Sequence, residues 1–402
     1  MKIAQITPYF LPHTGGVERY VYNLSKNLIR DGHTVEVITS NVPEGRALDV
    51  VDGIPVRRLK CIGEPLRNPL VPSIIFLFDE LKKFDIIHVH NLYGSLALSI
   101  PLLKKFCKIP LVLTHHGQLI YGEPVKDTCV KIYEKSIQEV ILKSVDNAVV
   151  LSESDAQYIS SSGLNNGNIE ILPNAINPGD FAKYMNVNTT EFIAKYHLEG
   201  RKRILFVGEV TNRKGVPTLI KSIPLLIKKV LKEEVVFVIV GSGENLSDAR
   251  TLARDLGVES HVVFTGRLPF VELMQAYRSS DLFVLPSLSE GLPTSILEAM
   301  YFGLPVVSTD IPGVRDHFSD FALLVPPRDE KALADAIHTL LEDGDLTKSL
   351  SQKGKALVTS QYTWDCVTGE YETLYSNICG FGPGCRKDRR ITDKGLSVGD
   401  KT

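Results

Sequence analysis

The chain alternates short apolar runs with longer amphipathic segments along most of its length. The segments near 17–30, 96–106 and 126–144 have the spacing of amphipathic helices. The runs between them are apolar throughout rather than at every second position, which predicts parallel strands covered by helices on both faces. This pattern favours an α/β fold. The runs of the first series are 2–7, 34–39, 86–90, 111–114, 147–151 and 169–172.

The pattern is interrupted near residue 180 and then restarts. Residues 181–200 are polar, and a length of 402 residues corresponds to about two domains. We therefore expect two facing, Rossmann-like, doubly wound domains with a cleft between them, at 1–180 and 181–360. The polar, glycine-rich residues 380–402 are expected to form a disordered tail. Expected strands of the second series are 203–207, 235–240, 262–265, 282–285, 305–308 and 323–325, with helices near 216–231, 245–256, 270–279 and 293–302.

The composition excludes several classes of protein. The 45 Lys+Arg against 47 Asp+Glu show no basic excess, which argues against a nucleic-acid partner. The six cysteines form no CxxC motif and are expected to be reduced thiols, and Cys379 and Cys385 receive no role. No apolar run approaches the roughly 20 residues of a spanning helix, and the first run breaks at Pro8, unlike a secretory leader. We expect a cytoplasmic protein that can still touch the inner face of the cell membrane.

Two glutamates follow the expected strand 282–285. Glu290 precedes Gly291, and Glu298 lies further along a helix that we expect to begin near Pro293. The start of this helix should face the cleft and offer free N–H groups to an anion. Carboxylates on both sides of an anion site suit the hydroxyls of a nucleotide sugar. The alternative is a solvent-exposed turn with ordinary surface glutamates, which the helix start and the glycine make less favoured.

Two further loops follow strands. In the loop from Gly208 to Gly215, the adjacent Arg213 and Lys214 can neutralise a diphosphate, although a solvated basic turn explains them equally well. Gly15-Gly16 permits close backbone approach to a ligand, or simply a tight turn. Neither this pair nor Gly241-Ser242-Gly243 completes GxGxxG, so a nicotinamide dehydrogenase is not favoured.

Other chemistries lack their residues. His88 and His90 alternate onto one face of a strand, but two ligands without a third give an incomplete metal site, so we expect no metal. We interpret His116 as a polar residue at the cleft, and Asp343-Gly344-Asp345 as a solvated turn between helices. There is no Ser/His/Asp order with a G-x-S-x-G elbow, and no Walker A or HExxH motif, to support a hydrolase or an ATPase.

Over about residues 1–378, the chain resembles the retaining GT-B glycosyltransferases often called family 4. The matching motifs appear in order, and the E-x7-E together with Arg-Lys-Gly is the most specific of them. These motifs are Gly15-Gly16-Val17-Glu18, Asp85-Ile86-Ile87-His88-Val89-His90, Leu113-Thr114-His115-His116, Leu172-Pro173-Asn174, the 208–215 loop, and Glu290 with Glu298.

The resemblance implies roles for these positions. Glu290 would hold the hydroxyls of the donor sugar, while Arg213 and Lys214 would bind the diphosphate and stabilise it as it leaves. Glu298 would bind the ribose, and His116 would contact the sugar from the first domain. The expected catalytic residues are thus Glu290, His116, Arg213 and Lys214, and the expected substrate-binding residues are Gly15, Gly16, Asn174, Gly208, Arg267, Leu268, Gly291, Leu292, Thr294 and Glu298.

The resemblance also implies that a final helix near 361–378 packs back on the first domain, and that no cofactor is needed. Two segments depart from the family pattern. Ala175-Ile176-Asn177 stands where Gly, a hydrophobic residue and Asp are common, and Pro312-Gly313-Val314-Arg315-Asp316 stands where many members have Gly-Gly and a Glu. These departures affect hinge geometry and acceptor contacts rather than the diphosphate site.

The sequence therefore predicts metal-independent transfer of a sugar from a UDP- or GDP-linked donor to a glycan or lipid-linked acceptor. A nucleotide-sugar epimerase of the same architecture, and an inactive sugar-nucleotide-binding homologue, remain alternatives. Apolar residues mixed with basic ones near 66–78 and 96–108 suggest peripheral membrane contact, although a core face with a solvated rim explains each stretch alone.

Overall fold

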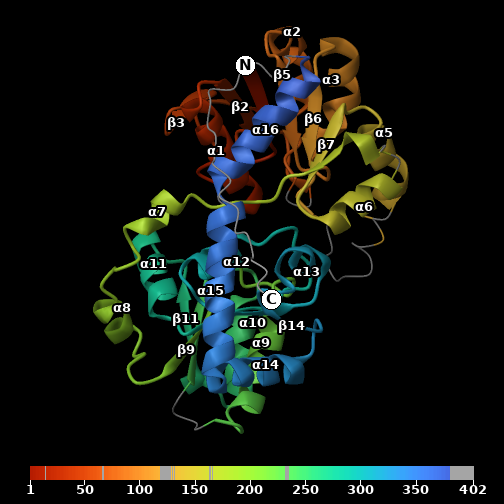
Figure 1. Ribbon diagram of the computed structural model, residues 1–402. Coiled ribbons are helices and arrows are strands. Elements are labelled where there is room, and N and C mark those ends of the chain that lie inside the picture. Colours follow the sequence, from red (N-terminus) through yellow and green to blue (C-terminus); the bar gives the residue numbers. More distant parts are fainter. Residues whose placement is uncertain are drawn as a thin grey trace, which may run out of the picture.

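The computed structural model of the chain describes residues 1–13, 15–65, 68–117, 128, 130, 132–162, 164, 166–230 and 235–380. Within these residues the strands form one eight-stranded and one six-stranded sheet, each built from one half of the chain (Figure 1). The expected fold class is confirmed: both sheets are parallel, apart from one edge strand, and their inner strands are largely buried. The expected tail falls on residues 381–402, which lie outside the described residues.

The first sheet has the order β3-β4-β2-β1-β5-β6-β7-β8, and β3 is antiparallel to β4. All six strands expected in this half are present. The apolar-run criterion misses β3 and β4, because Asp49 interrupts one strand and Arg57 and Arg58 interrupt the other. The strands are β1 (Lys2–Ile6), β2 (Thr34–Ser40), β3 (Leu48–Val51), β4 (Ile54–Leu59), β5 (Ile86–His90), β6 (Leu111–Thr114), β7 (Asn147–Val150) and β8 (Ile169–Ile171).

The second sheet has the order β11-β10-β9-β12-β13-β14, with every neighbouring pair parallel. Chain order reverses between β9 and β12, and such a switch point is where open α/β sheets bind ligands. The strands are β9 (Lys202–Val207), β10 (Val235–Val240), β11 (Val262–Gly266), β12 (Leu282–Leu285), β13 (Val306–Thr309) and β14 (Leu323–Val325). Helices α9 (Val216–Leu226), α10 (Leu246–Asp255), α11 (Phe270–Ser279), α12 (Thr294–Tyr301), α13 (Pro312–Phe318) and α14 (Glu330–Glu342) connect or follow them.

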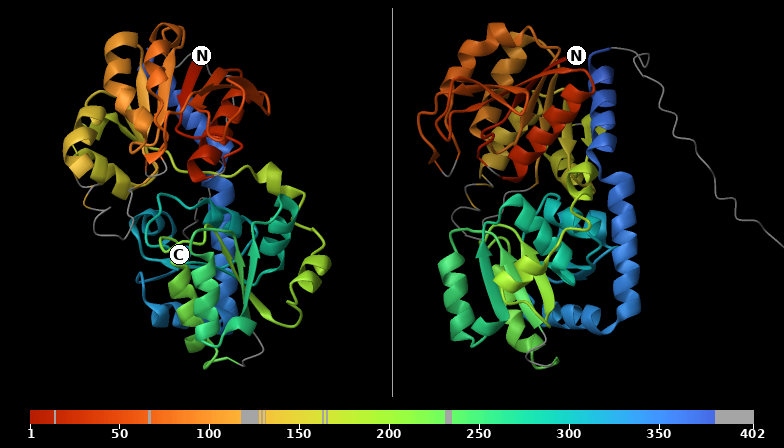
Figure 2. Two further views of the ribbon diagram at one scale, coloured as in Figure 1. Left: turned by 180° about the vertical axis from the view of Figure 1, so that it is seen from behind. Right: turned by 90° about the vertical axis from the view of Figure 1, so that its left-hand side faces the viewer.

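The chain crosses between the two sheets twice, and the two crossings lie side by side. Ile176 N donates to Tyr362 O over 3.0 Å, and Trp364 N donates to Ile176 O over 3.0 Å. Helices α15 (Gly344–Gln361) and α16 (Trp364–Ile378) follow one another along one side of both halves, as the right-hand view of Figure 2 shows.

Helix α16 packs against α1 (Gly16–Arg30), the helix that follows β1 (Figure 1). The buried hydroxyls of Tyr371 and Tyr20 lie 2.7 Å apart across this contact, and the Trp364 ring meets the Tyr20 ring edge-on at 4.9 Å. The helix from the end of the chain therefore becomes part of the core beneath the first sheet's switch point, between β1 and β5.

Candidate active site

The loops that follow β9 and β12 meet at the switch point of the second sheet. Gly215 begins α9 with φ +70°, and a Cβ atom at this position would lie 1.8 Å from the carbonyl oxygen of Pro286. Leu288 N also donates to Arg213 O over 2.8 Å. Only a glycine lets the basic loop approach the β12 loop this closely.

This approach brings three charged side chains together. Lys214 Nζ donates to Glu290 Oε1 over 2.5 Å, and Arg213 Nη1 lies 3.7 Å from Glu290 Oε2. Arg213 Nη1 also donates to Ser289 O over 2.9 Å. The structure thus joins the two motifs that the sequence analysis selected separately, although Lys214 and Glu290 are 76 positions apart in the sequence.

Glu290 is held as a carboxylate. Its side chain is 8% exposed, and burial raises its pKa, but the charges of Lys214 and Arg213 outweigh burial and leave the pKa below its ordinary value. The two cations and one anion leave a net positive charge at a solvent-restricted place, which suits an anionic ligand. The first N–H groups of α12, which has no side-chain cap, begin four residues beyond Glu290.

The β12 loop also touches the first sheet's domain. A Cβ atom on Gly291 would lie 2.5 Å from His116 O, and one on Gly117 would lie 2.8 Å from Gly291 Cα. On the other side, a Cβ atom on Gly313 would lie 2.0 Å from Gly291 O. The Pro312-Gly313 segment that departs from the family pattern therefore supports the backbone beside Glu290, a role that the sequence analysis did not identify.

The imidazole of His116 is partly buried among aromatic rings. Its Nε2 lies 3.2 Å from His90 Nδ1, and its ring meets the ring of Tyr20 edge-on at 4.9 Å. Burial, with a smaller effect from His115, lowers the pKa of His116 to about 3. His116 is therefore a neutral imidazole at physiological pH.

Glu298 has partners that sequence reasoning did not find. Tyr277 Oη donates to Glu298 Oε2 over 2.7 Å, and Arg19 Nη1 of α1 lies 3.5 Å from Glu298 Oε1. Burial raises the pKa of Glu298, and Arg19 and Tyr277 oppose this rise. The only signal for Arg19 in the sequence is its place in the first turn after Gly15-Gly16, where a side chain can point across to the second domain.

Gly15 and Gly16 lie at the N-terminus of α1, as expected. A Cβ atom on Gly15 would lie 2.3 Å from Glu18 Oε2, whereas the corresponding space at Gly16 is open. Glu18 is buried and lies 3.0 Å from His13 Nδ1, and this contact raises the pKa of His13 despite its partial burial.

The remaining predicted residues lie around these loops, some of them closer to the charged cluster than others. Leu292 is buried beside Glu290, and Thr294 begins α12. Gly208 packs against Gly241, whose Cβ atom would lie 1.9 Å from Gly208 O. Arg267 is exposed after β11, where its Nε donates to Ser242 Oγ over 2.8 Å, and Leu268 follows it.

Asn174 is not joined to this cluster. Its Oδ1 accepts a hydrogen bond from Ala175 N over 2.9 Å, in the segment that crosses between the sheets. Within the described ranges, no hydrogen bond links it to Glu290, Arg213 or Lys214.

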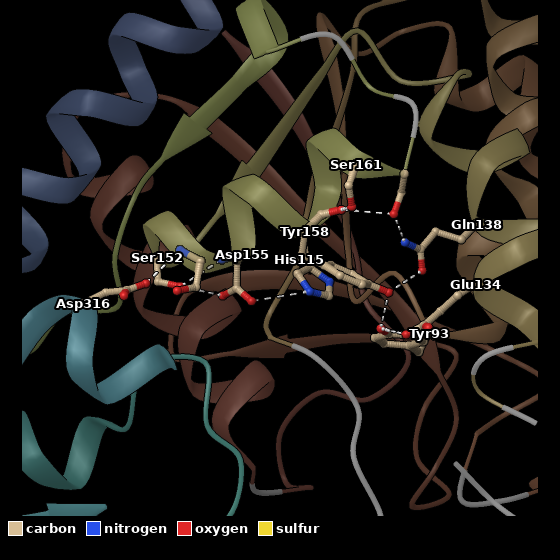
Figure 3. A network of polar contacts seen from close by, with 11 residues as sticks. Tyr93, His115, Glu134, Gln138, Ser152, Asp155, Tyr158, Ser161 and Asp316 are labelled. Carbon is tan, nitrogen blue, oxygen red and sulfur yellow. Dashed lines mark hydrogen bonds and ion pairs between the residues drawn. The ribbon is translucent and has the colours of Figure 1, made fainter. Parts of the chain in front are cut away.

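A second contact between the domains lies beside His115. Ser154 N, in α6 (Glu153–Ser161), donates to Asp316 Oδ2 of α13 over 2.7 Å. Figure 3 shows Asp155 reaching from the same helix toward His115, whose Nε2 is 3.8 Å from Asp155 Oδ1. Burial raises the pKa of Asp155 to about 6 and lowers that of His115 to about 4. His115 and His116 thus extend from one strand end toward different partners.

Two further findings concern the described part of the chain. It contains no group of three His, Cys, Asp or Glu side chains arranged to hold a metal ion. No helix in it is both long and apolar enough to cross a bilayer. Asp343, from the sequence's only Asp-x-Asp, lies exposed between α14 and α15, as the expected turn between helices requires, and it caps α15 by accepting a hydrogen bond from Leu346 N.

Comparison with known proteins connects this geometry to a family. Residues 14–180 match "Glycosyltransferase Family 4", and residues 188–357 match "Glycosyl transferases group 1". The chain is 27% identical over 400 residues to an uncharacterized glycosyltransferase of Methanocaldococcus jannaschii, covering 93% of this chain and 98% of that protein. It is also 27% identical over 401 residues to the GDP-mannose:cellobiosyl-diphosphopolyprenol alpha-mannosyltransferase of Xanthomonas oryzae, covering 94% and 98%.

The fold matches that of solved glycosyltransferase-like structures. Anabaena HepE in complex with UDP-glucose superposes with a TM-score of 0.75 at 17% identity, covering 94% of this chain and all of that one. Two facing parallel α/β domains of this kind constitute a GT-B-like fold. The chain belongs to family 4 of the glycosyltransferases, the group 1 glycosyl transferases, and is an enzyme that transfers a sugar from a nucleotide-sugar donor.

Proposed function

We propose that this enzyme transfers a sugar, with retention and without a metal ion, from a UDP- or GDP-linked donor to a glycan or lipid-linked acceptor. The observation that carries the proposal is the cluster of Lys214, Arg213 and Glu290 at the switch point of the second sheet. In this proposal residues 181–360 bind the donor, and residues 1–180, with the final helix, bind the acceptor.

The cluster suits the leaving group of such a donor. Glu290 neutralises Lys214 at 2.5 Å. A diphosphate would compete for Lys214 and Arg213 and would free the carboxylate to accept hydrogen bonds from sugar hydroxyls. The two cations and the N-terminus of α12 then stabilise the negative charge that grows on the phosphate as the glycosidic bond breaks.

The reaction balances without a protein nucleophile. The bond between the anomeric carbon and the β-phosphate oxygen breaks, and a bond from that carbon to the acceptor oxygen forms on the same face. The acceptor's proton passes to the departing phosphate, which leaves as a nucleoside diphosphate. His116 and Glu298 would hold the sugar and the ribose, respectively.

Donor binding can be tested without knowing the acceptor. UDP, GDP and ADP, with their common sugar conjugates, should be screened by thermal shift, since ligands that bind the folded state raise its melting temperature. Lys214→Ala should abolish the shift, and Lys214→Ala and Glu290→Ala should each lower transfer by at least about a hundredfold while leaving the fold intact. Lys221→Ala is a matched control, since Lys221 lies on α9 and pairs only at the surface with Glu330 at 3.8 Å. Normal transfer by both site variants would refute the assignment.

Two further measurements test the chemistry. Turnover should survive EDTA because Arg213 and Lys214 supply the positive charge; strict dependence on added Mg²⁺ would contradict this. Incubating a labelled donor without acceptor should leave the sugar's configuration unchanged, and an epimerised donor would refute the transferase mechanism.

The acceptor side carries an exposed apolar surface with lysines around it. Phe76 is 81% exposed and Phe106 is 49% exposed, and Phe106 stacks on Phe78 with ring centroids 5.5 Å apart. These residues lie in or beside the segment 72–77 and α3 (Ile100–Cys107). Lys105 Nζ lies 5.6 Å from the centre of the Phe106 ring, and Lys82, Lys83, Lys104 and Lys108 lie in the same stretches of sequence. Lys82 pairs with Asp79, and Lys104 pairs with Asp146. Apolar side chains with lysines beside them suit an anionic bilayer, and the Xanthomonas relative is named for an acceptor on a polyprenol diphosphate.

Vesicle co-sedimentation tests this contact. The enzyme should bind vesicles that contain anionic phospholipid more tightly than neutral ones, and Phe76→Ser with Phe106→Ser should reduce binding. Val271→Ser is the control, because Val271 is 48% exposed on α11 of the other domain. Binding that is equal on neutral and anionic vesicles, or unchanged in the double variant, would refute this part of the proposal. Residues 66 and 67, the first two of the expected stretch near 66–78, lie outside the described residues.

A further inference from the structure

A line of buried hydrogen bonds runs from the interior of the first sheet to His116. Gln5 of β1 and His90 of β5 are both fully buried, and Gln5 Oε1 lies 2.6 Å from His90 Nε2. His90 Nδ1 lies 3.2 Å from His116 Nε2. Because β1 and β5 are neighbouring strands, the sheet itself holds the first two members in place.

The chemistry of these groups determines which atom donates the hydrogen in each of these hydrogen bonds. The oxygen of an amide only accepts hydrogen bonds, so His90 Nε2 must carry a hydrogen and donate it to Gln5. A neutral imidazole has one N–H, which leaves His90 Nδ1 as an acceptor. The hydrogen between His90 and His116 must then belong to His116 Nε2, and the lone pair of His116 remains on Nδ1.

The surroundings favour neutral rings. Burial lowers the pKa of His90 well below its ordinary value, with smaller effects from His88 and His116. The oxygen is the atom of the Gln5 amide that faces His90, and the Gln5 nitrogen makes no hydrogen bond within the described part of the chain.

A parallel set of bonds separates the neighbouring His88 from this line. His88 Nδ1 lies 2.7 Å from Tyr375 Oη, and His88 Nε2 lies 2.6 Å from Thr114 Oγ1. His88 and His90 therefore stack with ring centroids 4.1 Å apart while using different partners. His88 and His90, which lie on one face of β5, therefore support the ends of the neighbouring strands from the interior of the domain.

We propose that His90, oriented by Gln5, is a positioning residue that fixes His116 as the Nε2–H tautomer, with Nδ1 free to accept a hydrogen bond from a substrate hydroxyl. This inference rests on the proposed role of His116 at the donor sugar. It assigns His116 the part of a neutral acceptor, rather than that of a cation or a donor. The edge of the Tyr20 ring, 4.9 Å away, restrains the rotation of the same imidazole.

The tautomer can be observed directly. Two-bond ¹H–¹⁵N correlation spectra of the ¹⁵N-histidine-labelled full chain report which ring nitrogen is protonated, and a His116→Gln sample assigns the signals. At neutral pH we expect a protonated Nε2 and a bare Nδ1 for His116. A protonated Nδ1, or an imidazolium, would overturn the inference. This readout needs no substrate, so its failure is distinct from a failure to bind nucleotide or to transfer sugar.

A pair of variants separates positioning from bulk packing. In His90→Asn, the amide oxygen can stand near the former Nδ1 and accept from His116, whereas His90→Leu offers no acceptor at similar size. We expect turnover of His90→Leu to fall about tenfold with little change in donor KM, equivalent to about 1.4 kcal/mol in the transition state, and His90→Asn to recover most of it. Equal activity of His90→Leu and His90→Asn would refute the proposed positioning of His116 by His90. If His90→Leu fails to fold, the wild-type spectrum still decides the matter, because a protonated Nδ1 on His116 would overturn the inference.

Discussion

The substitution Gly215→Ala tests whether the two loops of the second domain must touch for the site to form. Gly215 has φ +70°, and the added Cβ atom would lie 1.8 Å from Pro286 O, a backbone atom that no side-chain rotation can move away. Backbone strain for alanine in the left-handed region costs about 1–2 kcal/mol, and overpacking adds about 1–3 kcal/mol. We therefore expect the free energy of unfolding to fall by about 2–5 kcal/mol.

Gly257 is a matched control for the strain alone. It has φ +66° and follows α10, and a Cβ atom there would meet no heavy atom within 4 Å. Gly257→Ala should therefore lower the free energy of unfolding by only about 1–2 kcal/mol. The difference between the free energies of unfolding of Gly215→Ala and Gly257→Ala measures the steric cost of the close contact between the loops.

Urea titration gives both free energies, and calorimetric titration with the best nucleoside diphosphate gives the effect on the site. Because Lys214 and Arg213 immediately precede Gly215, a displaced loop should weaken nucleotide binding by at least about tenfold, while Gly257→Ala should bind as wild type does. Equal stability of the two variants together with unchanged nucleotide affinity would refute the argument from close approach.

Two other outcomes test the contacts around the site. Burial lowers the pKa of His115 to about 4 and of His116 to about 3, both from 6.5, so the unfolded chain binds more protons than the folded one below about pH 6.5. Between about pH 7.5 and about pH 5.5, each of these two imidazoles should lower the free energy of unfolding by up to about 1.3 kcal/mol. Burial raises the pKa of Asp155 from 3.8 to about 6, so this carboxyl should offset about 0.8 kcal/mol of the fall. These three groups together should give a fall of about 2 kcal/mol in urea titrations, to which the buried His90 adds in the same direction, and greater stability in acid would contradict burial of neutral imidazoles. In a double-mutant cycle of Arg19→Ala and Glu298→Ala, the coupling energy should stay below about 1 kcal/mol because Arg19 is 48% exposed; a larger value would mean that the pair is better shielded than its geometry indicates.

The parts of the site that follow strands could be predicted because parallel topology brings the carboxyl ends of strands to one edge. Arg213, Lys214 and Glu290 were found as two separate loops, and the switch point between β9 and β12 explains why they meet. Asn174 matched a family motif equally well, yet it bonds to its own neighbour, since motif position alone does not determine where a side chain points.

The sequence alone determined the α/β class, the two series of strands and the charged loops, because burial on both faces of a sheet requires continuous apolar runs and ligand contacts follow their ends. The tertiary structure decided which distant residues meet: Arg19 with Glu298, the backbone of His116 with Gly291, and His90 with His116. Such contacts leave no periodic trace, because each depends on how two separately folded elements pack rather than on local spacing. The same packing gives His116 its partner and, through it, the proton arrangement that we propose for the donor sugar site.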